Sequence, residues 1–381
     1  MPAGLLFSIY LIVFSAYFAV ATDPNEVFFL PGLYSGLTNQ RFSFYHSVMV
    51  SAVQNWTLVL PSWKMGYNDY IDGLTVPFSY FYEFNDEVLK KSKALQTWRY
   101  VTEMPRERLG ACFTQLQCSS FNDCKYPTLP VMEGRAKASR TVSLDCDSTY
   151  YTRKGIAHKQ YNTARLYEAP LLADLRNAMV VRPVFAEVAQ LIQRRLVKTF
   201  ASKSFVSVHY RMVADFLELC SKAAREGWQG SEKRACSDGE AAIHAKLQVL
   251  QIPHGTVLMF MNGEKADYFK SLPILCGAED CHASHQHQPD GAPFTLPAHC
   301  RSYICVRKEQ FWSSEKEAPV GFVSHDMSLS MVDFALATRA TLFLGNFYST
   351  MSQELFHVFR AAGKQAEMFN RLYSEFPGNC P

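Results

Sequence analysis

Three segments of the chain combine a predicted strand end or a glycine loop with side chains suited to holding a phosphate. The first runs from Ser35 to Arg41 (SGLTNQR), where Gly36 lets a ligand approach the backbone and Asn39 offers an amide donor and an acceptor. A tight turn whose asparagine caps a helix explains the same residues. The segment by itself therefore does not identify a binding site.

The second segment, His209-Tyr210-Arg211, follows the apolar run from Phe205 to Val208. Because residues two apart on a strand share a face, His209 and Arg211 are expected to point together toward a cleft. A guanidinium binds a phosphate with two parallel hydrogen bonds and stabilises the negative charge that grows when a sugar leaves a pyrophosphate. The alternative is a surface arginine paired with a carboxylate such as Asp215.

The third segment, from Thr341 to Thr350 (TLFLGNFYST), is typical of a strand, a glycine-containing loop and the start of a helix. The backbone N–H groups at a helix N-terminus attract anions, and the hydroxyls of Ser349 and Thr350 would add hydrogen bonds to a phosphate. An ordinary helix cap is the alternative.

The spacing of apolar residues indicates two α/β halves that would position these segments. In the first half, a strand at 27–30, a helix with apolar residues from Phe42 to Ala52 and a strand at 56–60 form one βαβ unit. Ligands bind at the carboxyl ends of parallel strands, so the loop at 34–39 would face a cleft. The second half is predicted to contain strands at 204–208, 256–262, 321–323 and 341–344 and helices at 328–338 and 351–359.

The region between these patterns is less regular. Cys112, Cys118, Cys124 and Cys146 lie among proline, serine, asparagine and aspartate, which predicts a disulfide-stapled insertion rather than regular structure. Residues 171–200 predict helices interrupted at Pro183, and we place the domain boundary near residue 202.

Composition and the N-terminal residues limit the class of protein. With 381 residues, 48% of them hydrophobic, the chain can form two cored domains, and a net charge of +3 disfavours a nucleic-acid partner. The apolar run from Leu5 to Val20, followed by Ala21, predicts a cleaved signal peptide at 1–21 and no stable membrane insertion afterwards, with a signal-anchor as the alternative. Eleven cysteines and the Asn55-Trp56-Thr57 triplet agree with the lumen of the endoplasmic reticulum or Golgi, or with secretion.

Taken in order, the three segments resemble the GDP-fucose protein O-fucosyltransferase family. SGLTNQRFSF, running into NWTLVLP, is similar to the family's GGLNNQR opening and the strand after it, especially in the plant-type branch. His209-x-Arg211, with Asp215 close behind, resembles the family's His-x-Arg signature, and Asp333 to Thr350 resembles its third motif. The cysteine-rich middle and residues 263–319 match no part of the family pattern, but ordered co-occurrence of three motifs is far more specific than any one of them.

That resemblance implies a GT-B-like α/β fold in which two Rossmann-like domains face each other across a cleft. Residues 22–201, with the cysteine-rich insertion, would form the acceptor side, and residues 202–381 would bind GDP-fucose. The implied reaction is an inverting transfer of fucose to serine or threonine hydroxyls of a protein acceptor, with no required cofactor and no essential metal.

The resemblance also implies roles for single residues. Arg211 would hold the β-phosphate and stabilise the departing GDP, with His209 in support. Asp333 would contact the guanosine. The contacts to pyrophosphate and fucose would come from both domains: Ser349 and Thr350 in the second, and Asn39 with Gly36 in the first.

The general base is left open by this comparison. One branch of the family carries a carboxylate in the first glycine loop, whereas no acidic residue occurs between Val27 and Gln40 here. Asp215 and His46 are candidates, and a path led by the leaving group needs a strong base less. Two other functions stay open: a secreted, non-catalytic nucleotide-sugar or glycan-binding protein of the same fold, and a fucosyltransferase acting on glycans.

Two further patterns are typical of metal sites. Asp145-Cys146-Asp147 fits the Asp-x-Asp pattern that holds a divalent ion to a nucleotide in other glycosyltransferases, but a pattern this short is expected about once by chance. The second pattern is a group of candidate zinc ligands: Cys276, Cys281, His282, His285, His287, Cys300 and Cys305. Disulfides are favoured for these cysteines because the secretory lumen is oxidising.

Overall fold

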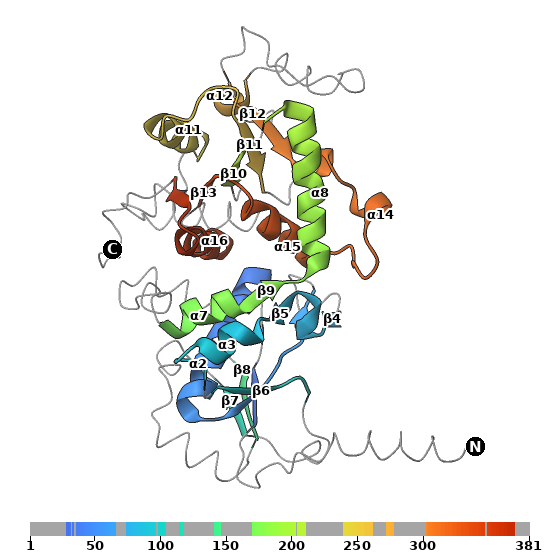
Figure 1. Ribbon diagram of the computed structural model, residues 1–381, viewed down its shortest axis with the longest axis vertical. Helices are drawn as coiled ribbons and strands as arrows, with labels where there is room; N and C mark the ends of the chain where they lie inside the picture. Colours follow the sequence, from blue (N-terminus) through green and yellow to red (C-terminus); the bar gives the residue numbers. More distant parts are fainter. Residues whose placement is uncertain are drawn as a thin grey trace, which may run out of the picture.

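The computed structural model divides into two halves along its long axis, and each half is built on a five-stranded sheet (Figure 1). The structure describes residues 28–31, 33, 36–65, 74–96, 98–103, 114–117, 141–145, 170–202, 204–210, 239–261, 272–277, 302–346 and 349–369. The signal peptide predicted at 1–21 lies outside these residues. Within them, no helix is long and apolar enough to cross a membrane.

The first sheet has the strand order β6-β2-β1-β8-β7, and every pairing in it is parallel. Helix α2 (Leu37–Gln54) connects β1 to β2, which confirms the predicted βαβ unit. The strands are β1 (Phe28–Pro31), β2 (Thr57–Val59), β6 (Arg99–Val101), β7 (Thr114–Gln117) and β8 (Thr141–Asp145).

The cysteine-rich middle is not wholly irregular, which corrects the prediction. Strands β7 and β8 come from this segment, and β8 pairs with β1 along its length, from Phe28 opposite Thr141 to Pro31 opposite Leu144. TQLQ contains one apolar residue, whereas TVSLD alternates polar and apolar residues, a strand signal that was missed among the irregular residues around it. Pairing with a neighbour already in the sheet decides their conformation.

Helix α2 begins five residues earlier than its apolar spacing predicts. Gly36 is its N-cap, so Asn39 lies in the first turn of the helix rather than in a loop. The first turn is polar yet buried, through Thr38, Asn39, Gln40 and Arg41, and a search for apolar residues therefore misses it. At the other end, the exposed Asn55 closes the helix in the left-handed conformation, with a φ of 54°.

The second sheet has the order β12-β11-β10-β13-β14 and is also parallel. Its apolar strands agree with the predictions at 204–208, 256–262 and 341–344. The strand predicted at 321–323 is wrong, because Gly321 takes a φ of +84° in a turn. The elements are β10 (Val206–His209), β11 (Val257–Phe260), β12 (Ile304–Arg307), β13 (Leu342–Gly345), β14 (Gln365–Met368), α11 (Gly239–Val249), α15 (Asp326–Ala337) and α16 (Thr350–Ala361).

The two halves share one apolar core. The larger cluster of buried side chains includes Phe44 and Leu175 from the first half together with Met331 and Leu355 from the second. A separate cluster covers the other face of the second sheet, where Val206, Val208 and their neighbours alternate with residues of the shared core. Both faces of this sheet are therefore covered, as expected for parallel strands.

The connection between the halves consists of α7 (Pro170–Ala178), β9 (Met179–Val181) and α8 (Pro183–Phe200). The break at Pro183 is confirmed, and β9 pairs antiparallel with β5 (Tyr82–Phe84). Helix α8 runs along the second half and packs on α15 (Figure 1). The boundary at residue 202 stays a prediction. The remaining elements are β3 (Trp63–Lys64), β4 (Thr75–Val76), η1 (Phe78–Tyr80), α3 (Asp86–Lys91), α12 (Pro273–Cys276), η4 (Lys308–Gln310) and α14 (Ser314–Glu317).

Cys276 and Cys305 form a disulfide between α12 and β12. The disulfide interpretation is therefore confirmed for these two cysteines. The bond joins the first cysteine of one C-x4-C pair to the second cysteine of the other. Cys281, His282, His285, His287 and Cys300 lie outside the described residues. Among the described residues, no group of histidine, cysteine and acidic side chains could hold a metal ion.

Candidate functional site

The carboxyl ends of the neighbouring strands β10 and β13 lie side by side. We call the side of the second sheet on which its strands end the carboxyl edge. His209 ends β10 and is in register with Gly345, which ends β13. Ligands of open parallel sheets bind at this edge, so the residues that follow these strands are candidates for a binding site.

Ser352, in the first turn of α16, connects the two strand ends. Its Oγ lies 2.8 Å from His209 Nδ1 and accepts a hydrogen bond from the backbone N–H of Asn346 at 3.0 Å. The ring of His209 is buried and held in one orientation by this contact. Ser349 and Thr350, at the N-terminus of the same helix, therefore lie about one turn from the residue that holds His209.

Gly345 is required by the closeness of α16 to the sheet. A Cβ at this position would lie 2.8 Å from Ser352 Cβ and 2.7 Å from Phe343 Cε1, distances that side chains do not tolerate. The glycine of the third motif therefore has a packing role, because it lets the first turn of α16 approach β13.

Asp333 is buried on α15 and forms an ion pair with Lys308, whose Nζ lies 2.5 Å from Asp333 Oδ2. Lys308 directly follows β12 and also lies 3.3 Å from Glu309 Oε1. Burial raises the pKa of Asp333 to about 6, although Lys308 opposes the shift. Burial by itself would lower the pKa of Lys308, but Asp333 and then Glu309 raise it, so both partners are charged at neutral pH.

The first half contributes helix α2, whose residues Gly36 and Asn39 were predicted to contact the donor. The next two residues, Gln40 and Arg41, contact different halves of the protein. The side-chain amide of Gln40 pairs with the backbone of Lys64 in β3, at 2.8 Å and 2.9 Å. Arg41 instead reaches α16 in the second half.

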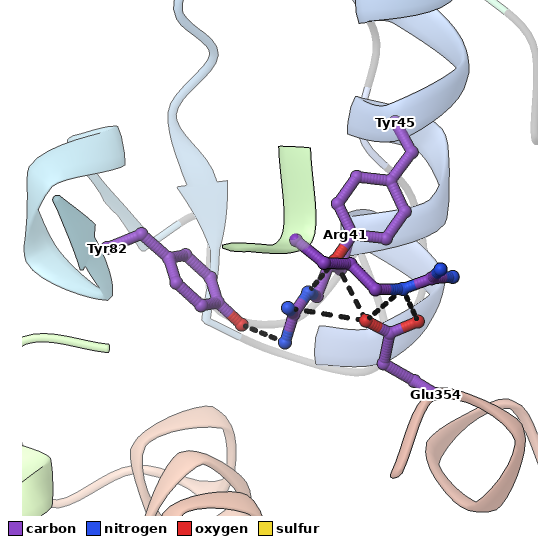
Figure 2. A network of polar contacts seen from close by, with 5 residues as sticks. Arg41, Tyr45, Tyr82 and Glu354 are labelled. Carbon is purple, nitrogen blue, oxygen red and sulfur yellow. Dashed lines mark hydrogen bonds and ion pairs between the residues drawn. The ribbon is translucent and has the colours of Figure 1, made fainter. Parts of the chain in front are cut away.

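Arg41 belongs to a buried group of five residues between the halves, which we call the interdomain charge cluster: Arg41, Tyr45, Tyr82, Arg176 and Glu354 (Figure 2). Glu354 Oε1 lies 3.3 Å from Arg41 Nη2 and 3.0 Å from Arg176 Nε, and it accepts a 2.8 Å hydrogen bond from the Tyr45 hydroxyl. Arg41 also donates hydrogen bonds to the hydroxyls of Tyr45 and Tyr82.

The charges of this cluster determine one another. Burial by itself would raise the pKa of the Glu354 carboxyl, but Arg176 and then Arg41 lower it, to about 2. Burial would likewise lower the pKa of Arg41, and Tyr45, Tyr82 and Glu354 raise it instead. The carboxylate and both guanidiniums are therefore ionised together at physiological pH.

A pocket of about 320 Å³ opens at the carboxyl ends of β1 and β2. Most of its lining is apolar, with Ser62, Lys64 and Thr75 as the polar members, and Lys64 connects it to α2 through Gln40. The apolar lining residues are Leu30, Pro31, Leu33, Val59, Leu60 and Pro61.

The structure brings together some of the predicted site residues. His209 lies near Ser349 and Thr350 through Ser352, whereas Gly36 and Asn39 lie at the start of α2 and Asp333 lies on α15. Arg211, Asp215 and Asp147 lie outside the described residues, as do the side chains of Asp145 and His46.

Sequence reasoning assigned no role to Lys308, Arg176, Ser352 or Glu354. For Glu354, a signal was available in the sequence: a charged residue on an apolar helix face. Glu354 is three residues after Met351 and four before Val358, on the stripe that packs against the core.

We expect Gly345→Ala to lower the free energy of unfolding by about 1–3 kcal/mol, because the added methyl group must displace Ser352 or Phe343. Thermal and urea melts measure this change. Gly363→Ala is not a matched control because Gly363 has a φ of +66°. Ala340→Gly, a change at a buried alanine near β13, controls for general sensitivity of this region. A Gly345→Ala melt that coincides with that of the wild type would contradict the packing role.

We expect Glu354→Gln to lower the free energy of unfolding by about 3–5 kcal/mol at pH 7, because two buried guanidiniums lose their counter-charge. Glu317→Gln removes a charge from the exposed Arg195–Glu317 pair and should leave the melt nearly unchanged.

The pH dependence of this stabilisation follows from the lowered pKa. The Glu354 carboxylate stabilises the fold fully above the reference pKa of 4.5, and this contribution disappears as the pH falls toward 2. The difference between the melts of the wild type and Glu354→Gln should shrink over that interval. A difference that stays constant from pH 7 to pH 3 would show that the charge is not the cause.

The chain is similar to known proteins both in sequence and in structure. The model of the GDP-fucose protein O-fucosyltransferase family matches residues 33–236, which is more than half of the chain. Crystal structures of POFUT1 in complex with GDP-fucose, in two crystal forms, match with a TM-score of 0.50 at 16% and 15% identity, covering 92% of this chain and 99% of that chain. Fucosyltransferase NodZ from Bradyrhizobium matches with a TM-score of 0.41 at 10% identity, covering 87% of this chain and 92% of that chain.

No curated protein matches the chain. The expected GT-B-like α/β fold with parallel sheets is confirmed by the POFUT1 structures. Because the family model matches more than half of the chain, the chain belongs to the GDP-fucose protein O-fucosyltransferase family.

Proposed function

We propose that this protein transfers fucose from GDP-fucose to a serine or threonine hydroxyl of a protein acceptor, with inversion at the anomeric carbon. Family membership supports the donor and the transferred sugar. The observation that carries the proposal is the contact of Ser352 with His209, which holds the start of α16 beside the end of β10. This contact supports a donor site in which His209, the first residue of the His-x-Arg signature, lies near the hydroxyl pair Ser349 and Thr350.

In this proposal, the diphosphate lies against the N-terminus of α16. Its backbone N–H groups and the hydroxyls of Ser349 and Thr350 bind the phosphate oxygens. Arg211 binds the β-phosphate, and His209, held by Ser352, supports that end of the donor. Asp333 contacts the guanosine with its carboxylate oxygens, while Lys308 keeps the carboxylate ionised at neutral pH.

The chemistry breaks the bond between fucose C1 and the β-phosphate oxygen, and the bonding electrons stay on that oxygen. Arg211 stabilises this charge, so that the sugar gains oxocarbenium character before the bond to the acceptor is complete. The acceptor hydroxyl attacks C1 from the opposite face and loses its proton to a base, for which Asp215 and His46 are candidates. The residues carry out this transfer without a required metal or cofactor.

The first half is proposed to bind the acceptor. The pocket at the ends of β1 and β2 has the apolar lining that a protein side chain would fill, and Asn39 lies on the helix that follows β1. The protein is proposed to act in the lumen of the secretory pathway, an oxidising compartment in which the Cys276–Cys305 disulfide persists.

One experiment tests the proposal directly. The purified protein is incubated with GDP-fucose and candidate secreted acceptors, and mass spectrometry identifies any added deoxyhexose and its attachment residue. Fucose on serine or threonine supports the proposal. Fucose found only on glycans supports a glycan fucosyltransferase, and calorimetric binding of GDP-fucose without transfer or hydrolysis supports a non-catalytic binding protein.

We expect Arg211→Lys to lower kcat by about 10²-fold or more, because an ammonium group cannot form the paired hydrogen bonds of a guanidinium. Steady-state kinetics with a saturating donor measures this change. Arg195→Lys, at an exposed ion pair on α8, serves as the control and should retain activity. Near-normal turnover of Arg211→Lys would remove this residue from the mechanism.

We expect the KM for GDP-fucose to rise as the pH falls below about 6, the value to which burial raises the pKa of Asp333. Protonation removes a charged acceptor for the guanosine and weakens the pair with Lys308. In Asp333→Asn the KM should be high at every pH and its dependence in this range should disappear. An unchanged pH profile in that variant would assign the effect to another group.

We expect transfer activity to survive treatment with EDTA, because charge on the leaving diphosphate is neutralised by a guanidinium and by helix N–H groups. Activity is measured with EDTA and again after addition of Mg²⁺ or Mn²⁺. Loss of activity that either ion restores would favour the Asp145-Cys146-Asp147 pattern as a metal site.

A further inference from the structure

The interdomain charge cluster joins the two halves through one carboxylate. Among the described residues, its polar members in the first half come from three elements: α2 supplies Arg41 and Tyr45, β5 supplies Tyr82, and α7 supplies Arg176. All four are arranged around Glu354 of α16, which has no solvent exposure. The contacts of this single side chain therefore depend on how the second half is placed against the first.

Stability alone does not explain such a cluster. Removing a carboxylate and two guanidiniums from water carries a large desolvation cost, and apolar residues of similar volume often stabilise a protein as well or better. Apolar side chains also adjoin the cluster, since Arg41 Cζ lies 4.9 Å from the ring centroid of Phe334 and the shared core lies beside it. Directional contacts between charged groups define one placement of the second half relative to the first, and apolar packing defines that placement less sharply.

The cluster lies close to the start of both helices that carry predicted donor contacts. Arg41 is two residues after Asn39, about half a helical turn, and Glu354 is four residues after Thr350, about one turn. Each helix is also attached to its own half near the same turn. Gln40 attaches α2 to β3, and Ser352 attaches α16 to His209.

A further ionisable group, His357, lies next to the cluster on the following turn of α16. Its pKa is lowered to about 4, first by burial and then by Arg176, so its ring is neutral at physiological pH. The charge balance at this position is therefore set by Glu354 and its two arginines.

We propose that Glu354, acting through Arg41 and Arg176, is a positioning residue that sets Asn39 of the first half against the fucose of a donor whose diphosphate lies at the start of α16. This inference rests on the proposed function, because it takes that diphosphate as the ligand. The GDP contacts lie in the second half, whereas the contact to the fucose comes from the first. Loosening the cluster therefore leaves GDP binding intact and misplaces the transferred sugar.

The test uses two variants that weaken the cluster to different degrees. Tyr45→Phe removes one hydroxyl that contacts both Glu354 and Arg41, and Glu354→Gln removes the central charge. Tyr303→Phe is the matched control, since it removes a hydroxyl from a buried tyrosine that contacts Ile252 in the second half. For each protein we measure the GDP Kd by calorimetry, and kcat and KM for transfer.

The expected result is a kcat that falls about 10- to 100-fold in Glu354→Gln and less in Tyr45→Phe, with the GDP Kd unchanged in both. Tyr303→Phe should match the wild type in all three quantities. Equal losses of GDP affinity and turnover in the two cluster variants would overturn the inference, because the second half itself would then be damaged. An unchanged kcat in both variants would overturn it as well.

A third variant separates positioning from stability. The combination Arg41→Met, Arg176→Met and Glu354→Leu replaces the charged members by apolar side chains of similar size, which we expect to restore the melting temperature. A folded, GDP-binding triple variant with low kcat supports positioning, whereas wild-type turnover shows that the cluster only stabilises. Absence of transfer by the wild type would refute the proposed function itself, which keeps the two failures distinct.

Discussion

The buried carboxylate of Glu354 is the interaction on which the docking of the two halves depends. A charge without solvent exposure must find counter-charges and hydrogen-bond donors within the protein, because water does not reach it. Arg41, Arg176 and Tyr45 provide them, and all three belong to the first half. The charge is therefore satisfied only when the halves meet in one arrangement, and the shared apolar core supplies the attraction that brings them together.

Helix α16 links this interface to the carboxyl edge of the second sheet. In its first turns, the helix presents a buried N-cap at Ser349, holds His209 through Ser352 and inserts Glu354 between the halves. Gly345 permits this arrangement, because any side chain there would push the helix away from β13. In the proposed function, donor binding and interdomain docking both depend on this one helix of twelve residues, so a shift of α16 would disturb both.

The apolar runs around β1, β10, β11 and β13 predicted the order of the elements well, because burying both faces of a parallel strand requires local runs of apolar residues. The start of α2 was missed since its first turn buries polar side chains, which apolar spacing does not detect. The strands β7 and β8 were missed for a different reason. They are short and lie among irregular residues, and pairing with a neighbouring strand makes them extended.

The sequence by itself determined the three motifs, the order of the elements that carry them and the family, because each depends on residues close together along the chain. Only the tertiary structure decided which distant polar groups meet. Tyr45 and Glu354 are 309 residues apart, and Arg176 and Glu354 are 178 apart. The pairing of Cys276 with Cys305 was decided in the same way. A glutamate on a helix has the same local sequence pattern whether it faces solvent or another domain, so its partners follow from docking alone.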